Sequence, residues 1–230
     1  MISTSRLADV FVEVADTLVD DFDLVDFLDN LTEHVVAVSG ADAVGIVLAD
    51  VHGALQFMAA SNDAGRALEL FQLQSSEGPC QDAYRSGEPV LNLDLGNASD
   101  LWPEFAPRAQ EAGFRSVHAF PMRLRDETIG ALNIFGRTPV NFAEDDVRIV
   151  QSLTDIATIA LLQERYIAQA ELLAEQLQGA LNSRITIEQA KGALSRMEGV
   201  SVDEAFLIMR HRARSERLRL VDVAQAILAT

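Results

Sequence analysis

The sequence predicts an α+β fold: a domain of antiparallel strands with flanking helices, then a long coiled-coil-like linker helix, then a bundle of three short helices. Two observations support this fold class. Between residues 43 and 135, short apolar segments of strand-like composition are separated by turn residues, with helical patterns before and after them. From residue 143 onward, apolar residues recur with helical spacing. We therefore expect a mixed domain over residues 1–145, a linker helix over 146–182 and the bundle over 183–230.

The mixed domain is predicted to begin with helix and to continue into strands. Over residues 5–38, apolar side chains recur on one helical face; they include Leu7, Val10, Phe11, Val14, Phe27, Leu28, Leu31 and Val35. Strands are predicted at residues 43–49, 54–60, 90–93, 116–124 and 128–135. Asp50, His52 and Gly53 form a turn between the first two strands, and a short charged turn joins the last two. This order indicates an α+β domain rather than a doubly wound sheet.

The linker helix is predicted from the absence of proline and glycine between residues 143 and 178. Its seam positions follow the alternating spacing of three and four residues that is typical of a coiled coil; they are Leu153, Ile156, Ala160, Gln163, Ile167, Ala170, Ala174, Leu177 and Leu181. Up to Leu162 the helix can pack on its own domain, but the later seam has no core of its own to cover. We therefore expect a homodimer that forms through this helix.

Three apolar stripes predict the helices of the bundle. The first consists of Ile187, Ala190 and Leu194, the second of Val202, Ala205, Phe206, Met209 and Ala213, and the third of Leu220, Val223, Ala224, Ile227 and Leu228. Gly199 stands where a helix C-cap is needed, and Ser201 with Glu204 forms a capping box. Glycine at position 192 destabilises a helix by about 1 kcal/mol relative to alanine. The close approach of either a neighbouring helix or a ligand would explain why glycine is used there.

The bundle is the only basic region of an acidic chain. Residues 183–230 carry 8 Lys and Arg against 6 Asp and Glu, whereas residues 1–182 carry 10 against 29. Such a chain does not suit non-specific coating of DNA, but a local basic patch can bind a polyanion. Helical spacing places Arg210, Arg214 and Arg217 on one ridge, and it places Arg184 and Lys191 nearly in line on the first helix.

At these residues the segment resembles an ANTAR domain, a three-helix module of bacterial transcription antitermination regulators that binds RNA stem-loops. The resemblance rests on the SR-x-x-IEQAKG-x-L block at residues 183–194, the DEAF block at 203–206 and the R-x-x-AR spacing from Arg210 to Arg214. We expect the main RNA contacts from Arg184, Lys191, Arg210 and Arg214, with Gln189 as a candidate base reader. The family commonly has Asn where this chain has Arg217, and Arg217 is expected to add affinity for phosphate. Because Phe206 is expected in the core, stacking on bases would fall to arginine.

Residues 10–165 resemble a GAF domain, a sensory fold with a central antiparallel sheet flanked by helices. The shared features are the strand order, the EGPC-x-DA-x-x-SG segment at residues 77–87, and the strands SVHAFPMRL and IGALNIFG. The resemblance implies a small-molecule pocket or a dimerising signal module, with an unknown ligand. The candidate pocket residues are Cys80, Tyr84, Trp102, Phe114, His118 and Phe120.

The sequence carries no signal of an enzyme or a metal site. Its four histidines and Cys80 lack metal-ligand spacing, and no P-loop or dinucleotide fingerprint is present. Cys80, the sole cysteine, is expected to be a buried thiol. The sequence has no uninterrupted apolar run long enough to predict a membrane-spanning helix, so we expect a cytoplasmic protein.

Together these features predict a signal-responsive transcription antitermination regulator that binds RNA stem-loops in transcript leaders. Two other functions stay open at this point. The bundle could serve a DNA-binding transcriptional regulator, or its arginine ridge could dock on an acidic partner in a protein–protein signalling adaptor.

Overall fold

The computed structural model describes residues 12, 23–139 and 141–229. The chain forms two compact units, Met1–Glu164 and Arg165–Thr230. Helix α6 (Glu144–Glu198) contributes residues to both units. Four apolar residues of the first predicted helix, Leu7, Val10, Phe11 and Val14, lie outside the described residues. Within the described part, no helix is both long and apolar enough to cross a membrane.

The first unit is built on a five-stranded antiparallel sheet with the strand order β2-β1-β5-β4-β3. The strands are β1 (Ala43–Ala49), β2 (Leu55–Ala60), β3 (Val90–Asp94), β4 (Ser116–Leu124) and β5 (Glu127–Gly136). All five are predicted from the sequence, with bounds that differ by no more than one residue. At the first hairpin, the Asp50 carboxylate accepts hydrogen bonds from the N–H groups of His52 at 2.8 Å and Ala54 at 3.0 Å. These bonds hold the pKa of Asp50 below its ordinary value.

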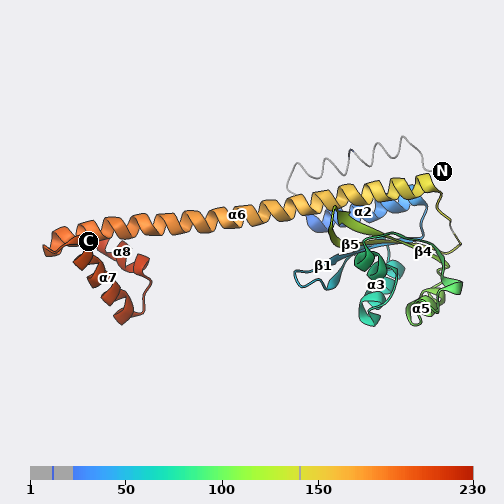
Figure 1. The fold of residues 1–230 in the computed structure, drawn as a ribbon, viewed down its shortest axis with the longest axis horizontal. Helices are drawn as coiled ribbons and strands as arrows, with labels where there is room; N and C mark the ends of the chain where they lie inside the picture. The colour runs from blue at the N-terminus through green and yellow to red at the C-terminus, as the bar shows by residue number, and fades with distance from the viewer. Residues whose placement is uncertain (1–11, 13–22, 140, 230) are drawn as a thin grey trace. The chain divides into compact units, whose positions relative to one another are not determined.

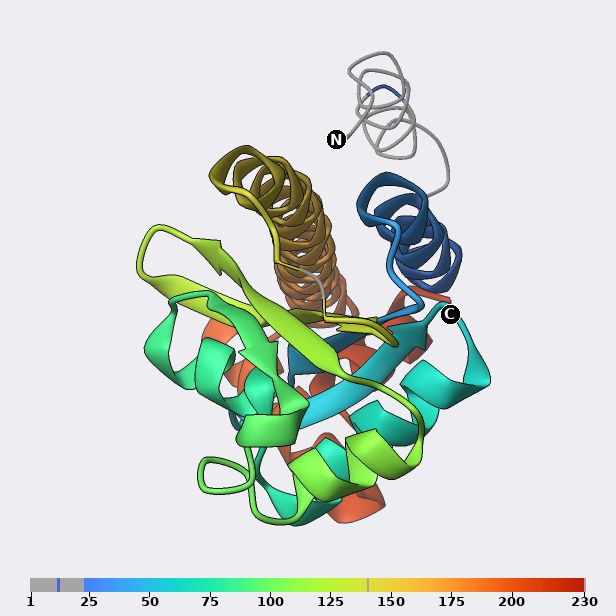
Figure 2. The ribbon, with the colours of Figure 1, turned by 90° about the vertical axis from the view of Figure 1, so that its right-hand side faces the viewer.

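Different helices cover the two faces of this sheet, as Figures 1 and 2 show. Helix α2 (Leu24–Ser39) and the first part of α6 lie on one face. The other face carries α3 (Asp63–Ser75), α4 (Pro79–Ser86) and α5 (Phe105–Glu111), with the short 3-10 helix η1 (Leu95–Asn97) beside α5. Asp23 caps the start of α2, where its carboxylate accepts from the N–H of Val25 at 2.8 Å, and Gly40 caps the end of the helix in the left-handed conformation.

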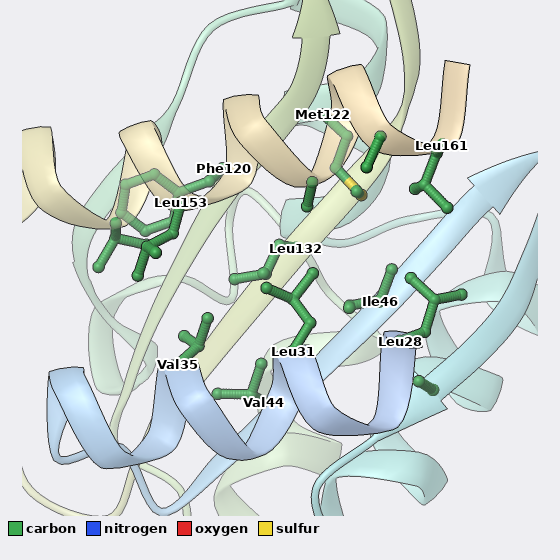
Figure 3. Packing of buried hydrophobic residues seen from close by; sticks show 14 of the residues in the cluster. Leu28, Leu31, Val35, Val44, Ile46, Phe120, Met122, Leu132, Leu153 and Leu161 are labelled. Atoms are coloured by element: carbon green, nitrogen blue, oxygen red, sulfur yellow. The ribbon is translucent and has the colours of Figure 1, made fainter. Parts of the chain in front are cut away.

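The main core fills the space between the sheet, α2 and α6 (Figure 3). Because side chains alternate along a strand, every second residue of the central strands faces these two helices. The buried side chains labelled in Figure 3 are Leu28, Leu31, Val35, Val44, Ile46, Phe120, Met122, Leu132, Leu153 and Leu161. The apolar stripe predicted for α2 is therefore confirmed, and the stripe of α6 covers the sheet up to Leu162.

The opposite face of the sheet holds two further apolar clusters. Aromatic rings dominate the larger one, in which Trp102 meets Phe105 edge to face at a centroid distance of 5.9 Å and Phe114 meets Phe135 at 5.6 Å. The smaller cluster lies between α4 and the sheet and consists of Val47, Cys80, Ala83, Ala119 and Ala131. Cys80 is a free, fully buried thiol, as predicted.

Helix α6 is longer than predicted, with 55 residues that include both Gly179 and Gly192. The sequence predicts an interruption near Gly179, but one glycine costs only about 1 kcal/mol in a helix and no proline follows it in α6. Propagation of an existing helix is favourable enough to continue through such a residue. The linker and the first helix of the bundle are therefore one helix. Between residues 165 and 182 every side chain is exposed.

The second unit contains the predicted bundle of three helices. The end of α6 packs with α7 (Val202–Glu216) and α8 (Leu220–Leu228) around a core of Ala190, Leu194, Ala205, Met209, Ala213, Val223, Ala224 and Ile227. The turn before α7 has the predicted caps. Gly199 adopts φ 67°, and the Ser201 N–H donates to the Glu204 carboxylate at 2.9 Å while the Ser201 hydroxyl accepts from the Glu204 N–H at 3.2 Å.

Four residues of the bundle differ from the prediction: Val202, Phe206, Leu228 and Arg217. Val202 is 45% exposed, Leu228 is 42% exposed, and Phe206 is only half-buried and lies outside the apolar core. Helix α7 ends at Glu216, and Arg217 caps it with φ 55° in the left-handed conformation. The helical projection therefore does not extend to Arg217. Gly192 has no described atom within 4 Å of the place where a Cβ would stand, so no neighbouring helix of the chain requires glycine there.

Candidate nucleic-acid interface

Two cations lie beside the ring of Phe206 in the second unit. The Lys191 Nζ is 5.2 Å from the ring centroid, and the Arg210 Cζ is 5.9 Å from it. Both distances are within the range of a cation–π interaction. Helices α6 and α7 thus bring two residues of the predicted RNA set together on one aromatic side chain. The spacing of Lys191 and Arg210 in the sequence did not predict this contact, because it depends on how the two helices pack.

Lys191 also has an acidic partner on its own helix. Its Nζ lies 2.9 Å from the Glu188 carboxylate, and its side chain is only 15% exposed. The alkyl chain is thus covered by the bundle, while the ammonium group is held between a carboxylate and a ring. An RNA phosphate that binds Lys191 would have to compete with Glu188.

The arginines predicted to bind RNA are exposed and available. The described residues form no ion pair with any member of the set Arg184, Arg210, Arg214 and Arg217. Two other arginines of this unit are engaged: Arg212 lies 3.1 Å from Glu216, and Arg219 lies 2.7 Å from Asp222. The Arg219 hydrogen bond also lowers the pKa of Asp222. Among the described residues of this unit, Arg184, Arg210 and Arg214 of the motif therefore form no ion pair, and neither do Arg196 and Arg217.

The predicted residues do not all share one side of the bundle. Arg210 and Arg214 are one turn apart on α7, and Arg184 is two turns from Lys191 on α6, about 10 Å along the axis. Gln189 is two residues from Lys191 and is therefore on the opposite side of α6. Arg217 follows the end of α7 and is held by hydrogen bonds from its backbone N–H to the carbonyls of Ala213 and Arg214.

In the first unit, the six candidate pocket residues are distributed over both faces of the sheet. Trp102 and Phe114 belong to the aromatic cluster under α5, whereas Cys80 and the half-buried Tyr84 lie one turn apart on α4. Phe120 faces α2 and α6. The structure therefore does not bring these six residues together around one cavity.

His118 lies on the same face as Phe120 and is nearly fully buried. Its ring stacks on Phe142 with a centroid distance of 4.3 Å, and its Nδ1 accepts a hydrogen bond from the Asn92 N–H at 3.0 Å. The cavity beside it has a volume of about 10 Å³, close to the minimum for one water molecule. His118 is therefore a packed residue of the core in this conformation.

A buried polar cluster, which the sequence did not predict, lies between the sheet and helices α3 and α4. The Asn133 amide donates to both Glu69 carboxylate oxygens at 2.8 and 3.0 Å, and the Gln72 amide donates to the same carboxylate at 3.1 Å. Gln72 in turn accepts from the Cys80 N–H at 3.1 Å. Burial raises the pKa of Glu69 to about 8, and burial together with Glu69 raises the pKa of the Cys80 thiol.

The backbone of β1 is adapted to this cluster. A Cβ at Gly45 would overlap the side chain of Glu69, so only glycine leaves room for the carboxylate above the sheet. Gly45 and Asn133 are partners in the register of β1 and β5, which aligns them across the sheet. The one signal in the sequence was Asn133 itself, a polar residue in the centre of an otherwise apolar strand.

A groove of about 570 Å³ lies near the β4–β5 turn of the first unit. Its charged lining is mixed and consists of Glu88, Arg123, Arg125, Asp126 and Asp155. None of the six predicted pocket residues lines this groove. Among the described residues, no group of three or more His, Cys, Asp or Glu side chains is placed to hold a metal ion.

Comparisons with known families agree with this geometry. Residues 23–162, more than half of the chain, match the GAF domain family, and residues 175–228 match the ANTAR domain family. A comparison with curated protein sequences gave no match.

Solved structures with the same fold cover the first unit. The GAF domain of a phosphoenolpyruvate-protein phosphotransferase from Acinetobacter is 21% identical, covers 72% of this chain and 98% of its own, and has a TM-score of 0.54. The corresponding domain from Coxiella burnetii is 19% identical, covers 73% and 99%, and has a TM-score of 0.56. Free methionine-R-sulfoxide reductase from Neisseria meningitidis is 20% identical, covers 73% and 96%, and has a TM-score of 0.54.

At these identities the likeness concerns the fold alone, and one of the three similar structures is an enzyme. The matched families themselves are regulatory. GAF domains are sensory modules, and ANTAR domains are RNA-binding modules of transcription antitermination. The chain therefore belongs to the GAF domain family and carries an ANTAR domain at its C-terminal end.

Proposed function

We propose that the protein is a signal-responsive, non-enzymatic regulator of transcription antitermination that binds RNA stem-loops in transcript leaders. One observation supports this proposal most directly: Arg184, Arg210 and Arg214 of the ANTAR motif are exposed and form no ion pair with the described residues, in a chain with a net charge of −17. A polyanion could bind these arginines without breaking an ion pair, whereas Arg212 and Arg219 are already paired with carboxylates. The remaining surface of an acidic chain repels phosphate, so binding is focused on the bundle.

The RNA contacts follow from the chemistry of a loop. Arg184, Lys191, Arg210 and Arg214 would hold phosphates, and Arg217 would add a further contact beyond the end of α7. Gln189 would reach RNA only from the other side of α6, where it could read a base edge. Binding to the nascent transcript would favour the antiterminator hairpin over the terminator. This role places the protein in the cytoplasm.

The GAF domain would supply the signal. A small molecule is the expected input, and the residues proposed to receive it are Cys80, Tyr84, Trp102, Phe114, His118 and Phe120. Cys80, Trp102 and Phe114 are packed between the sheet and α4 or α5, so a ligand could reach them only if one of these helices moved away from the sheet. His118 and Phe120 lie on the opposite face and would require α2 or α6 to move. We keep residues 1–145 as the sensory part, 146–182 as the linker and 183–230 as the RNA-binding part.

The linker would pair two copies of the chain. Ile167, Leu177, Leu181 and Ile185 are each more than half exposed on α6, and they recur on one side of the helix. Exposed apolar side chains in a continuous stripe are costly in water unless a partner covers them. A second copy offers an identical stripe. The dimer would present two bundles to paired stem-loops and raise the affinity through effective concentration.

Binding of the full chain to a pool of RNA hairpins with a fixed stem and a randomised loop tests the proposal. Arg210→Ala and Arg214→Ala should each weaken binding and reduce its dependence on salt, because each removes a phosphate contact. Arg212→Ala removes the same charge from a different side of α7 and is the matched control. Preferential binding to duplex DNA, or to an acidic protein with no RNA binding, would favour one of the two alternative functions instead.

A further inference from the structure

We propose that Phe206 is the base-stacking residue of this surface: its ring receives one unpaired base of the loop, and Lys191 and Arg210 beside it hold the adjoining phosphate. This inference rests on the proposed binding of RNA and names the group that recognises a nucleotide there.

The first argument is the position of Phe206. The ring is half-buried and stands outside the apolar core of the bundle, although burial of a phenylalanine side chain stabilises a fold by roughly 2 to 3 kcal/mol. The core is filled instead by Ala205 and Met209 on the same helix. Phe206 is also the only aromatic side chain between residue 167 and the end of the sequence. A ring that does not complete the core is available for a ligand.

The second argument is the pairing of this ring with two cations from different helices. The Lys191 ammonium and the Arg210 guanidinium lie 5.2 and 5.9 Å from the ring centroid. Both groups lie over the ring, so a base that stacks on the ring would displace one of them toward the adjoining phosphate. A nucleotide carries a flat base next to a phosphate, and a ring beside two cations matches both parts. An acidic peptide would use the cations but not the ring.

The third argument concerns Glu188. Its carboxylate is 2.9 Å from the Lys191 Nζ and 57% exposed, so it occupies the position that a phosphate would take. The bound phosphate would displace this carboxylate. Glu188→Gln should then strengthen RNA binding, because the competing charge is removed while the length of the side chain is kept.

The experiment uses the full chain and hairpins that the wild-type protein selects from a pool with randomised loops. Phe206→Leu keeps an apolar side chain and should lower the affinity by roughly 5- to 100-fold, which corresponds to the loss of one stacked base. Phe206→Tyr should stay within about twofold of the wild type, because the ring is retained. The slope of affinity against salt should be the same for Phe206→Leu and the wild type, since no phosphate contact is removed.

A fluorescent base separates stacking from a merely structural role. With 2-aminopurine at one loop position after another, at least one position should change its fluorescence on binding to the wild type and to Phe206→Tyr, but not to Phe206→Leu. If Phe206 only supported Lys191 and Arg210, Phe206→Leu would instead reduce the salt slope, as Lys191→Ala should.

The possible failures are distinct. If the wild type binds selected hairpins and Phe206→Leu binds them equally well, the stacking role is overturned and the proposed function stands. If the wild type selects no hairpin but binds an acidic protein or duplex DNA, the proposed function is overturned and the stacking role with it.

Discussion

Glu69 offers the most direct physical test of the first unit, because it is a carboxyl buried in the fold with only amide partners. Its pKa rises from the ordinary value of 4.5 to about 8, with burial as the main cause. Between these two values the folded chain keeps the proton that the unfolded chain releases. The free energy of unfolding therefore falls as the pH rises from about 4.5 to 8, and it does not recover above that range.

The magnitude follows from the shift. Each pH unit in this window removes about 1.4 kcal/mol, so Glu69 costs about 3 kcal/mol at pH 7 relative to a neutral isostere. Glu69→Gln should stabilise the first unit by an amount that approaches this value at pH 7 and is about 1 kcal/mol at pH 5. The Gln amide has an acceptor available, because the Asn133 Oδ1 is buried and forms no hydrogen bond with the described residues.

The assay is urea unfolding followed by tryptophan fluorescence at pH 5, 6, 7 and 8. Trp102 is the only tryptophan of the chain, is 1% exposed and belongs to the first unit, so its emission reports the unfolding of that unit. The difference between Glu69→Gln and the wild type isolates the carboxyl of interest, since all other titrating groups are shared. Glu88→Gln, which changes an exposed carboxylate, is the matched control and should change stability by less than about 1 kcal/mol. Equal pH dependence of Glu69→Gln and the wild type would refute the reasoning, because it would mean that Glu69 is ionised in the fold.

Three further predictions concern the second unit. Replacement of both Leu177 and Leu181 by Lys should shift the chain from dimer to monomer in sedimentation equilibrium. Leu172 is equally exposed but lies on the opposite side of α6, so Leu172→Lys should leave the dimer intact. A dimer that survives the double substitution would show that the interface lies elsewhere. Arg217→Asn should stabilise the end of α7 by roughly 1 kcal/mol, because Asn tolerates the left-handed conformation better than Arg, and should slow amide hydrogen exchange there. Gly192→Ala should raise the melting temperature followed by circular dichroism, since it stabilises the helix by about 1 kcal/mol and meets no atom; a lower melting temperature would indicate that another molecule approaches at this position.

Much of the fold could be predicted because its signals are local. Short apolar segments between turn residues define the five strands, and the caps at Gly199 and Ser201 define the start of α7, since each depends on residues within a few positions of one another. The end of α7 could not be read in the same way. Arg217 is a good helix former, and only the left-handed cap, formed as the chain turns into α8, removes it from the ridge of Arg210 and Arg214.

The sequence by itself determined the α+β domain, the helical bundle and the family motifs, because periodicity and motif spacing are properties of the chain alone. The tertiary structure decided which side chains meet. It brought Lys191 of α6 and Arg210 of α7 together at the ring of Phe206. It also placed Glu69 next to Gly45 and in hydrogen-bond contact with Asn133, which is 64 positions away along the chain. Such contacts depend on how helices and sheet pack, and that packing is set by the shape of the whole core rather than by any local pattern.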